Sequence, residues 1–238
     1  MNPVVLEAIN VGKIYGNGDL QVHALHPTSI EIRRREVLVI MGPSGSGKTT
    51  LLSILGLVLA PTEGEVRLDG QVVTKAKADV LAQLRRDKVG FIFQQFNLLS
   101  GLSAIDNVAI PLLLRGTGAR ERSERARRVL GLVSMSDKIN VKARKLSVGQ
   151  QQRVAIARAL VADAGVLLCD EPTASLDGTS GRAVLDTLQT LARSENRAVV
   201  IVTHDDRVLR IADRLIYVED GQVREQPHLK QPNTGAIQ

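Results

Sequence analysis

The sequence predicts an α/β fold built on a mostly parallel β-sheet with helices on both faces. Short apolar runs that suit buried strands alternate with longer segments whose apolar residues recur at helical spacing. The run over residues 37–41 is apolar throughout, which is typical of a parallel strand buried on both faces. The chain has 238 residues, enough for one large domain with its own hydrophobic core.

The individual elements follow in order along the chain. Strands are expected over residues 4–8, 30–32, 37–41, 89–93, 166–169, 199–202 and 215–218. Helices are expected over residues 49–59, 151–161 and 184–192. The Asp-Gly pair at 69–70 predicts a hairpin over 66–72. From residue 97 to about 145 strand signals stop, and Ala126, Val129 and Leu130 fall at helical spacing among arginines, so we expect a helical insert.

Composition and charge limit the classes of function. The net charge of +6 suits a phosphate ligand, an anionic membrane surface or nucleic acid, and equally a merely solvated basic surface. Aromatic residues make up only 2% of the chain, which leaves little for base stacking and disfavours nucleic acid. The single cysteine, Cys169, excludes an intrachain disulfide. No apolar run approaches the ~20 residues that span a bilayer, and no signal peptide is visible, so we expect an intracellular protein that reaches a membrane through a partner.

Residues 42–49 match the phosphate-binding loop pattern, between a predicted buried strand and a predicted helix. The glycines let the backbone fold tightly, so that successive N–H groups and the helix N-terminus point at the phosphates. Lys48 would place a charge on the β- and γ-phosphates, and the Thr49 hydroxyl would ligate Mg²⁺. The expected nucleotide contacts here are Gly42, Pro43, Ser44, Gly45, Ser46, Gly47, Lys48, Thr49 and Thr50. The motif alone leaves kinases, switches, helicases and transporters open.

Two further segments suit phosphate chemistry. The predicted strand 166–169 runs into Asp170, which is placed to hold Mg²⁺, and Glu171, which can polarise a water for attack on the γ-phosphate. Ser147 is a good N-cap for the helix after it, and a helix start with Ser147 and Gly149 is a second anion-binding site. Because the chain already has a phosphate loop, we expect this second site to serve a nucleotide held by another copy.

Together these segments resemble the ATPase domains of ABC transporters, from Tyr15 to about Val223. The matching motifs are the phosphate loop (42–49), the Q-loop (91–94), the signature Leu-Ser-Val-Gly-Gln (146–150), the carboxylate motif Asp-Glu-Pro-Thr (170–173), the D-loop (175–177) and the switch histidine in Thr-His-Asp (203–205). The resemblance implies a P-loop NTPase domain of the ABC type, with an N-terminal antiparallel β region and a helical subdomain inserted into the parallel core. The implied division of a single domain, 1–238, is a nucleotide-binding core over 1–93 and 146–226, a helical subdomain over 94–145 and a flexible tail over 227–238.

The resemblance also implies roles for single side chains. Tyr15 would stack on the adenine ring, and His204 would hydrogen-bond the γ-phosphate. Gln94 would contact Mg²⁺ or the attacking water and sense the permease, with its neighbour Gln95 as an alternative register. Asp177 would communicate across a dimer. The implied catalytic residues are Glu171, His204 and Gln94; the metal ligands are Thr49, Gln94 and Asp170; and the nucleotide contacts outside the phosphate loop are Tyr15, Ser147, Gly149, Gln150 and Asp177.

Within the family, the phosphate loop and residues 90–94 and 151–160 look closest to macrolide exporters, lipoprotein-releasing systems and heterocyst-glycolipid exporters. This resemblance implies an ATP- and Mg²⁺-dependent ATPase that works as a homodimer, peripheral to the cytoplasmic face of the inner membrane. Its partners would be a separate integral membrane permease and, in some such systems, a periplasmic adaptor, but no nucleic acid. The cargo would be a lipid-like or amphiphilic substrate that is exported or extracted.

Three other functions compete with this interpretation. The first is the ATPase of a cell-division-type ABC complex, which signals across the membrane rather than transporting. The second is an ABC ATPase that acts on DNA or ribosomes, but the chain lacks the long coiled coil or the second ATPase unit typical of these classes. The third is a P-loop kinase, in which the signature segment would have no task.

The sequence departs from the family pattern at three positions. Val148 stands where the signature usually has glycine, although Gly149, which must approach phosphate closely, is kept. Ala143 stands where proline is common before the signature, and Arg35 occupies a usual glycine turn. We expect activity to survive the first departure and the other two to tune local rigidity.

Overall fold

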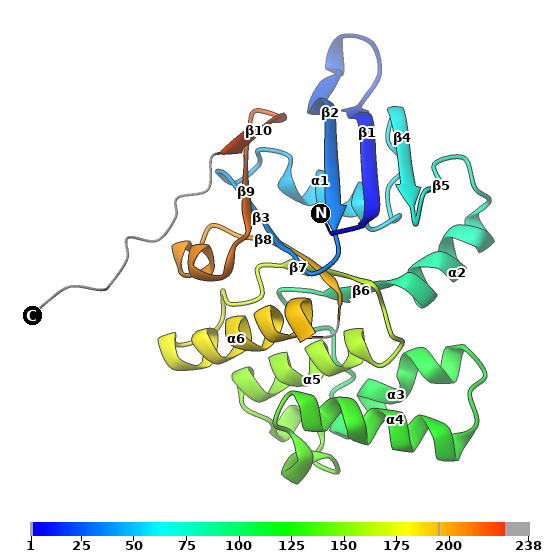
Figure 1. The fold of residues 1–238 in the computed structure, drawn as a ribbon, viewed down its shortest axis with the longest axis vertical. Coiled ribbons are helices and arrows are strands. Elements are labelled where there is room, and N and C mark those ends of the chain that lie inside the picture. Colours follow the sequence, from blue (N-terminus) through cyan, green and yellow to red (C-terminus); the bar gives the residue numbers. More distant parts are fainter. Residues whose placement is uncertain (1, 195, 227–238) are drawn as a thin grey trace, which may run out of the picture.

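Two β-sheets organise the computed structural model, which describes residues 2–194 and 196–226 (Figure 1). Within these residues, the larger sheet has the order β10 (Gln222–Gln226), β9 (Arg214–Glu219), β3 (Val37–Met41), β8 (Ala198–Val202), β7 (Val166–Asp170) and β6 (Val89–Ile92). Strands β9 to β6 pair in parallel, and β10 pairs antiparallel with β9. The predicted mostly parallel sheet is therefore confirmed.

The second sheet is antiparallel and is built from the N-terminal part of the chain. Its order in the described residues is β2 (Val22–Arg33), β1 (Val4–Tyr15), β4 (Glu63–Leu68) and β5 (Gln71–Val72). Strands β1 and β2 extend well beyond the predicted ranges, because exposed polar residues along them interrupt the apolar pattern. Asp69 and Gly70 join β4 to β5 with φ values of 48° and 76°, as a type I′ hairpin turn requires.

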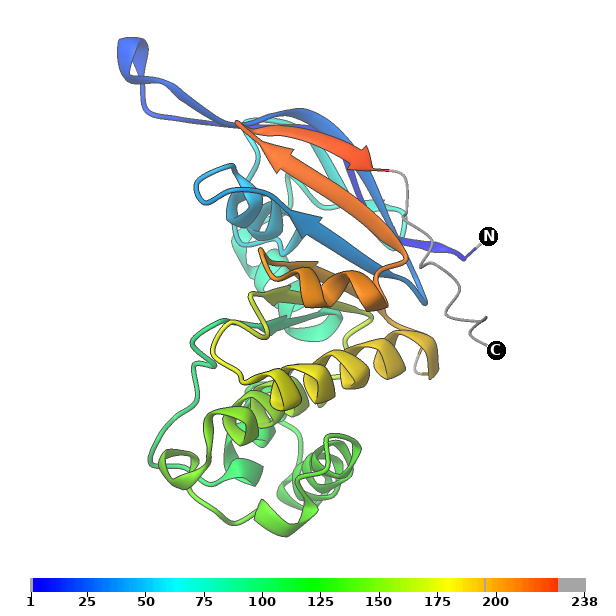
Figure 2. The same ribbon diagram turned by 90° about the vertical axis from the view of Figure 1, so that its left-hand side faces the viewer.

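The central strands of the larger sheet, β3, β8 and β7, are buried on both faces. Helix α1 (Lys48–Leu55) and the antiparallel sheet cover one face, and helices α5 (Val148–Leu160) and α6 (Gly178–Ser194) cover the other (Figures 1 and 2). The alternation is visible along β3, where Leu38 and Ile40 pack with α1, whereas Val37 and Val39 pack toward α5 and α6. This double burial explains why the strand sequences are apolar without alternation.

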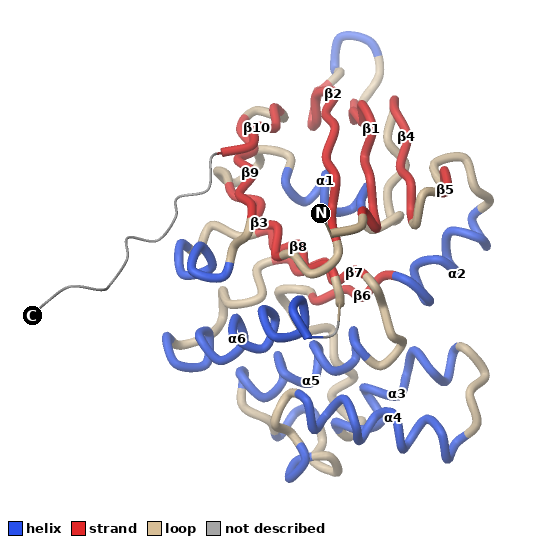
Figure 3. The backbone as a smooth tube through the Cα atoms, viewed as in Figure 1, coloured by secondary structure: helices blue, strands red, loops and turns tan. Residues whose placement is uncertain are grey.

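The remaining helices lie outside this layered core (Figure 3). They are α2 (Ala78–Lys88), α3 (Ala104–Leu114), α4 (Ala119–Leu132) and the short 3₁₀ turns η1 (Gly18–Leu20), η2 (Ser136–Lys138), η3 (Ala143–Lys145) and η4 (Asp206–Ile211). Helices α3 and α4 fall between β6 and α5, where the sequence predicts a helical insert, and Ala126, Val129 and Leu130 of α4 are buried. Within the described ranges, no helix combines the length and apolar character needed to cross a bilayer. The predicted flexible tail, 227–238, lies outside the described residues.

Some element boundaries differ from those predicted. Helix α1 ends at Leu55 rather than near residue 59, because Gly56 packs against the Phe91 ring and Leu57 turns to a φ of 58°. Helix α5 begins at Val148 rather than at residue 151. Helix α2 and strand β10 are not predicted: no residue of α2 is buried, and β10 is mostly exposed.

All three departures from the family pattern have a structural account. Arg35 adopts a left-handed φ of 61°, the conformation that explains a glycine preference at this turn. The Ala143 N–H donates to the Leu102 carbonyl oxygen at 2.9 Å, a hydrogen bond that a proline at this position would lose. Val148 is the first residue of α5 and is 46% exposed, so its side chain fits without displacing a neighbour.

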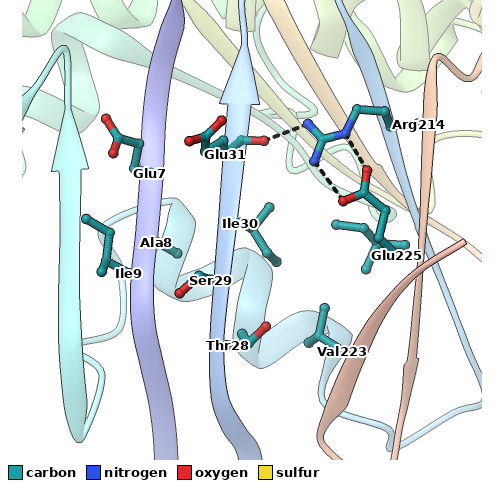
Figure 4. Close-up of a pocket in the computed structure, with 11 residues that line it drawn as sticks. Glu7, Ala8, Ile9, Thr28, Ser29, Ile30, Glu31, Arg214, Val223 and Glu225 are labelled. Carbon is teal, nitrogen blue, oxygen red and sulfur yellow. Dashed lines mark hydrogen bonds and ion pairs between the residues drawn. The ribbon is translucent and has the colours of Figure 1, made fainter.

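A cavity of about 480 Å³ separates part of β2 from β10, where the edges of the two sheets approach each other (Figure 4). Arg214 spans this gap by binding Glu225 on β10 and the Glu31 carbonyl oxygen on β2, at 2.8 Å each (Figure 4). It also donates to the buried Glu36 carboxylate at 3.1 Å, whose pKa is raised by burial. These contacts join the two sheets. The cavity is not part of the candidate functional site.

Candidate functional site

The predicted phosphate, carboxylate and switch segments meet at one edge of the larger sheet. Because β3, β7 and β8 run parallel, their carboxyl ends lie together, and Gly42, Glu171 and Thr203 follow them directly. Backbone hydrogen bonds continue the pairing past the strand ends: Glu171 N–H donates to Val202 at 2.9 Å, and Thr203 N–H donates to Ile40 at 3.1 Å. Residues far apart in the sequence therefore form one site.

The phosphate loop is held in a backbone path that requires glycine at two positions. Gly42 has a φ of 149° and Gly47 a φ of 105°, and an added Cβ at either would lie under 3.0 Å from a backbone carbonyl oxygen, of Val218 or Ala24 respectively. Gly47 is the N-cap of α1, so Lys48, Thr49 and Thr50 form the first turn of that helix. The loop thus presents a helix N-terminus to its ligand.

Two polar groups of this loop suit a bound phosphate. The Lys48 ammonium is folded over the loop and donates to the carbonyl oxygens of Gly42 and Pro43, at 2.9 and 2.6 Å. Burial lowers the pKa of Lys48, while Glu171 and Asp170 oppose that shift. The Ser46 hydroxyl is buried and has no hydrogen-bond partner within the described residues.

The two carboxylates at the end of β7 differ in their surroundings. Asp170 is the last residue of β7, and its pKa is raised by burial and by the nearby Glu171, with Lys48 opposing. Glu171 has a left-handed φ of 49°, an unusual conformation for a non-glycine residue that turns the chain out of the strand. A cation beside Asp170 would stabilise its charged form, which burial disfavours.

The segment after β8 holds Glu171 from the other side. His204 Nδ1 lies 2.7 Å from Glu171 Oε1, and the His204 side chain is 75% exposed, whereas that of Glu171 is only 14% exposed. The Thr203 hydroxyl donates to Glu171 Oε2 at 2.8 Å. Both carboxylate oxygens of Glu171 are therefore contacted by the switch segment.

Sequence reasoning did not assign roles to a further cluster beside this pair. Thr173 donates its hydroxyl proton to Asp205 Oδ2 at 2.7 Å, and Arg207 contacts both Asp205 oxygens. Hydrogen bonds from Arg207 and Thr173 lower the pKa of Asp205 to about 2. Thr173 and Asp205 lie within the recognised motifs, so their closeness in sequence to Glu171 and His204 is the signal that could have identified them. Arg207 lies two residues after Asp205, outside the motif.

The signature segment lines a cavity of its own on the protomer. Ser147 and Gln150 make a reciprocal capping box at the start of α5. The Gln150 N–H donates to the Ser147 hydroxyl oxygen at 3.3 Å, and the Ser147 N–H donates to Gln150 Oε1 at 3.0 Å. They line a cavity of about 350 Å³ together with Gly149, Lys138, Arg153 and Ser180, and no phosphate-loop residue is part of this described lining. Among the described residues, this cavity is therefore formed without the protomer's own phosphate loop.

Two other predicted side chains, Tyr15 and Asp177, lie at the end of a strand and before the start of a helix. Tyr15 ends β1 and is 44% exposed, and the Lys13 ammonium sits 5.4 Å from its ring centroid. Asp177 accepts hydrogen bonds from the Thr179 and Ser180 N–H groups, at 2.9 and 3.0 Å, at the start of α6. These bonds lower the pKa of Asp177.

Gln94 follows β6 and is exposed. The loop that contains it is fixed by Arg158 of α5, which donates to the Phe96 carbonyl oxygen at 2.7 Å and also to that of Asn97. An apolar cleft of about 490 Å³ lies beside this loop, and its lining includes Phe93, Leu114 and Val58, which are 39%, 69% and 62% exposed.

The donor set fits Mg²⁺. Within the described residues no group of three or more His, Cys, Asp or Glu side chains is arranged to hold a metal, as a dedicated all-protein cage would need. A nucleotide-associated Mg²⁺ instead uses one or two protein oxygens plus phosphates and water. Thr49 and Asp170 supply hard oxygen donors of that kind, at the start of α1 and the end of β7.

Comparisons with known proteins agree with this geometry. Residues 25–174 match the sequence model of the ABC transporter family. The chain is 43% identical over 225 residues to MJ0796 of Methanocaldococcus jannaschii, an uncharacterized ABC transporter ATP-binding protein, covering 93% of this chain and 96% of that one. It is 44% identical over 223 residues to the macrolide export ATP-binding/permease protein MacB of Hyphomonas neptunium, covering 94% of this chain but only 34% of that relative. The chain thus spans about a third of the length of that MacB relative.

A solved structure shares the fold. A dimeric post-hydrolysis state of the ATP-binding cassette MJ0796, bound to ADP and Pi, superposes with a TM-score of 0.85 at 42% identity. The match covers 93% of this chain and 97% of the solved one. The family match, the identity over nearly the whole chain and the shared fold establish that this protein belongs to the ABC transporter ATP-binding family.

Proposed function

We propose that two copies of this chain bind ATP–Mg²⁺ between them, hydrolyse it and thereby drive a separate membrane permease that exports or extracts an amphiphilic, lipid-like substrate. The observation that carries the proposal is that the signature segment and the phosphate loop do not share a cavity on one protomer. The Ser147 cavity has no phosphate-loop lining, so a second copy is needed to bring the signature and the loop onto one nucleotide. The dimeric, ADP- and Pi-bound state of MJ0796 supports this arrangement.

In the proposed mechanism, the loop N–H groups and Lys48 hold the β- and γ-phosphates, and Tyr15 stacks on the adenine. Ser147, Gly149 and Gln150 of the second copy contact the γ-phosphate from the other side, with Asp177 at the dimer contact. Because ATP then binds the closed pair better than the open one, it shifts the equilibrium toward closure, and loss of the γ-phosphate reverses the shift.

Hydrolysis in this proposal depends on a fixed carboxylate. Glu171 accepts a hydrogen bond from the attacking water and takes its proton, while His204 hydrogen-bonds the γ-phosphate. The contacts of Glu171 with Thr203 and His204 support the role, because they fix where its oxygens lie. Mg²⁺ held by Thr49, Asp170 and Gln94 would supply positive charge that offsets the charge on the phosphates.

We propose that the permease docks at the apolar cleft beside the Gln94 loop. Exposed Phe93, Leu114 and Val58 offer a surface for a short apolar segment of the permease, and Arg158 ties the loop to α5. The protein would then be peripheral to the cytoplasmic face of the inner membrane. The name of the MacB relatives supports export, whereas the lipid-like cargo and a periplasmic adaptor rest on the family resemblance alone.

The base assignment is tested by Glu171→Gln. We expect ATP hydrolysis to fall at least about a hundredfold, the scale of a general base, while ATP and Mg²⁺ now trap a dimer that light scattering after gel filtration detects. Adding Ser147→Arg to this variant should abolish the trapped dimer. The matched control is Glu124→Gln on the exposed face of α4, which makes the same chemical change far from the site. A Glu171→Gln protein that still hydrolyses ATP normally contradicts the assignment.

The transport proposal is tested by identifying the membrane protein that co-purifies with the chain. We expect an export-type permease, and we expect Leu114→Arg to weaken its capture without changing ATPase activity of the isolated chain. Co-purification with a peptidoglycan-hydrolase regulator would instead favour the cell-division-type complex.

A further inference from the structure

We infer that Thr203 and Asp205 are positioning residues for hydrolysis, which hold the Glu171 carboxylate in one orientation at the site. This inference rests on the proposed role of Glu171 as the base. Thr203 is completely buried, and its hydroxyl lies 2.8 Å from Glu171 Oε2. A buried hydroxyl that binds the carboxylate of a general base can fix the direction in which that carboxylate faces the attacking water.

The hydrogen-bond directions around Thr203 are fixed by counting protons. A threonine hydroxyl has one proton to donate and two lone pairs that accept. The Asp205 N–H donates to the Thr203 oxygen at 3.0 Å, which occupies a lone pair. The single proton is therefore directed to Glu171 Oε2, and that hydrogen bond fixes the orientation of the carboxylate.

Asp205 in turn anchors the segment that carries Thr203 and His204. It accepts from Thr173, which follows Glu171 by two residues, and from the Arg207 backbone and side chain, at 2.7 to 3.0 Å. Because its pKa is about 2, Asp205 stays charged at any pH at which the enzyme would work. The charge of Asp205 therefore stays constant, and its hydrogen bonds join the loop after β7 to the loop after β8.

Strain at Glu171 explains why such support is needed. A non-glycine residue with a φ of 49° sits in a sparsely populated region, which persists only when its surroundings determine it. Two backbone hydrogen bonds fix the main chain: Glu171 N–H donates to the Val202 carbonyl oxygen at 2.9 Å, and the Ala174 N–H donates to the Glu171 carbonyl oxygen at 3.3 Å. The side chain, by contrast, is oriented by Thr203 and His204, and His204 is largely exposed, which leaves Thr203 as the buried partner.

The test uses Thr203→Val, which keeps the branched shape and removes the hydroxyl, in full-length protein with ATP and Mg²⁺. We expect kcat to fall about ten- to a hundredfold, the scale of a lost hydrogen bond to a charged group, with KM and ATP affinity nearly unchanged. Thr203→Ser should restore most of kcat. The matched control is Thr187→Val on α6, whose hydroxyl donates to the Ala183 carbonyl oxygen within the same helix, and kcat should not change.

A double-mutant cycle separates positioning from general damage. In a Glu171→Ala background there is no carboxylate to position, so adding Thr203→Val should leave the residual single-turnover rate unchanged. The inference is wrong if Thr203→Val lowers the single-turnover rate of the Glu171→Ala protein by the same factor as in the wild type. It is also wrong if Thr203→Val alone leaves kcat intact while Glu171→Gln abolishes turnover, and in that case the base assignment stands. If the wild-type dimer does not hydrolyse ATP, the proposed function itself fails.

Asp205→Asn provides a second variant. It should lower kcat in the same direction as Thr203→Val and add little to it when the two are combined, because both act on the same carboxylate. Additive losses would mean that Asp205 acts by another route and would overturn its assignment as a positioning residue for Glu171.

Discussion

Replacing Gly47 by alanine should destabilise the protein before any nucleotide is involved. The residue has a φ of 105°, and the new Cβ would lie under 3.0 Å from the Ala24 carbonyl oxygen, a backbone atom that cannot rotate away. The left-handed conformation costs about 1–2 kcal/mol for a residue with a Cβ, and forced overpacking costs about 1–3 kcal/mol more. We therefore expect the free energy of unfolding to fall by about 2–5 kcal/mol.

Gly45→Ala separates the two contributions. Gly45 has a φ of 80°, but an added Cβ would meet nothing within 4 Å among the described residues, so only the conformational cost of about 1–2 kcal/mol applies. Urea unfolding of the nucleotide-free proteins measures both losses, and the Tm of Gly47→Ala should drop by on the order of 10 °C. Equal losses for the two variants would refute the steric argument at Gly47.

Two further predictions concern the conformation and charge of single residues. Arg35→Gly should raise the free energy of unfolding by up to about 1 kcal/mol, because the strain of a φ of 61° is relieved and the side chain is exposed; urea midpoints that fall instead contradict this. The Asp205 pKa of about 2 lies below its ordinary value of 3.8, so its stabilisation is complete above about pH 4 and is lost as the pH falls through 2. Asp205→Asn should therefore cost about 2 kcal/mol at pH 7, and the difference from wild type should shrink between pH 4 and 2 in unfolding measurements. A difference that does not depend on pH would show that charge is not the cause.

The parts of the fold that sequence predicts well are those whose signal is local. The loop over 42–49 and the hairpin at Asp69 need only their own residues and turn chemistry. The buried strands are recognisable because both faces are covered, so every residue along them is apolar. Helix α2 escapes prediction because none of its residues is buried, and β10 because it is mostly exposed and therefore lacks an apolar pattern.

The candidate site also contains residues that the sequence predicts and contacts that it does not. Lys48, Asp170 and Glu171 stand in recognisable patterns, whereas the contacts of Thr203 and Asp205 depend on the register between β7 and β8. That register is a tertiary property, and one chain offers no local signal for it. The left-handed φ of Glu171 was likewise invisible, since glutamate carries no preference for that conformation.

The hydrogen bonds from Arg158 to the loop after β6 have a consequence for which sequence changes this loop tolerates. Its guanidinium holds the main-chain oxygens of Phe96 and Asn97, not their side chains. The side chains at 96 and 97 take no part in this connection, although their left-handed φ values of 54° and 49° restrict which residues can stand there. A connection made to main-chain atoms therefore constrains the backbone conformation at the point of contact rather than the side-chain chemistry, whereas the arginine that completes it cannot be exchanged.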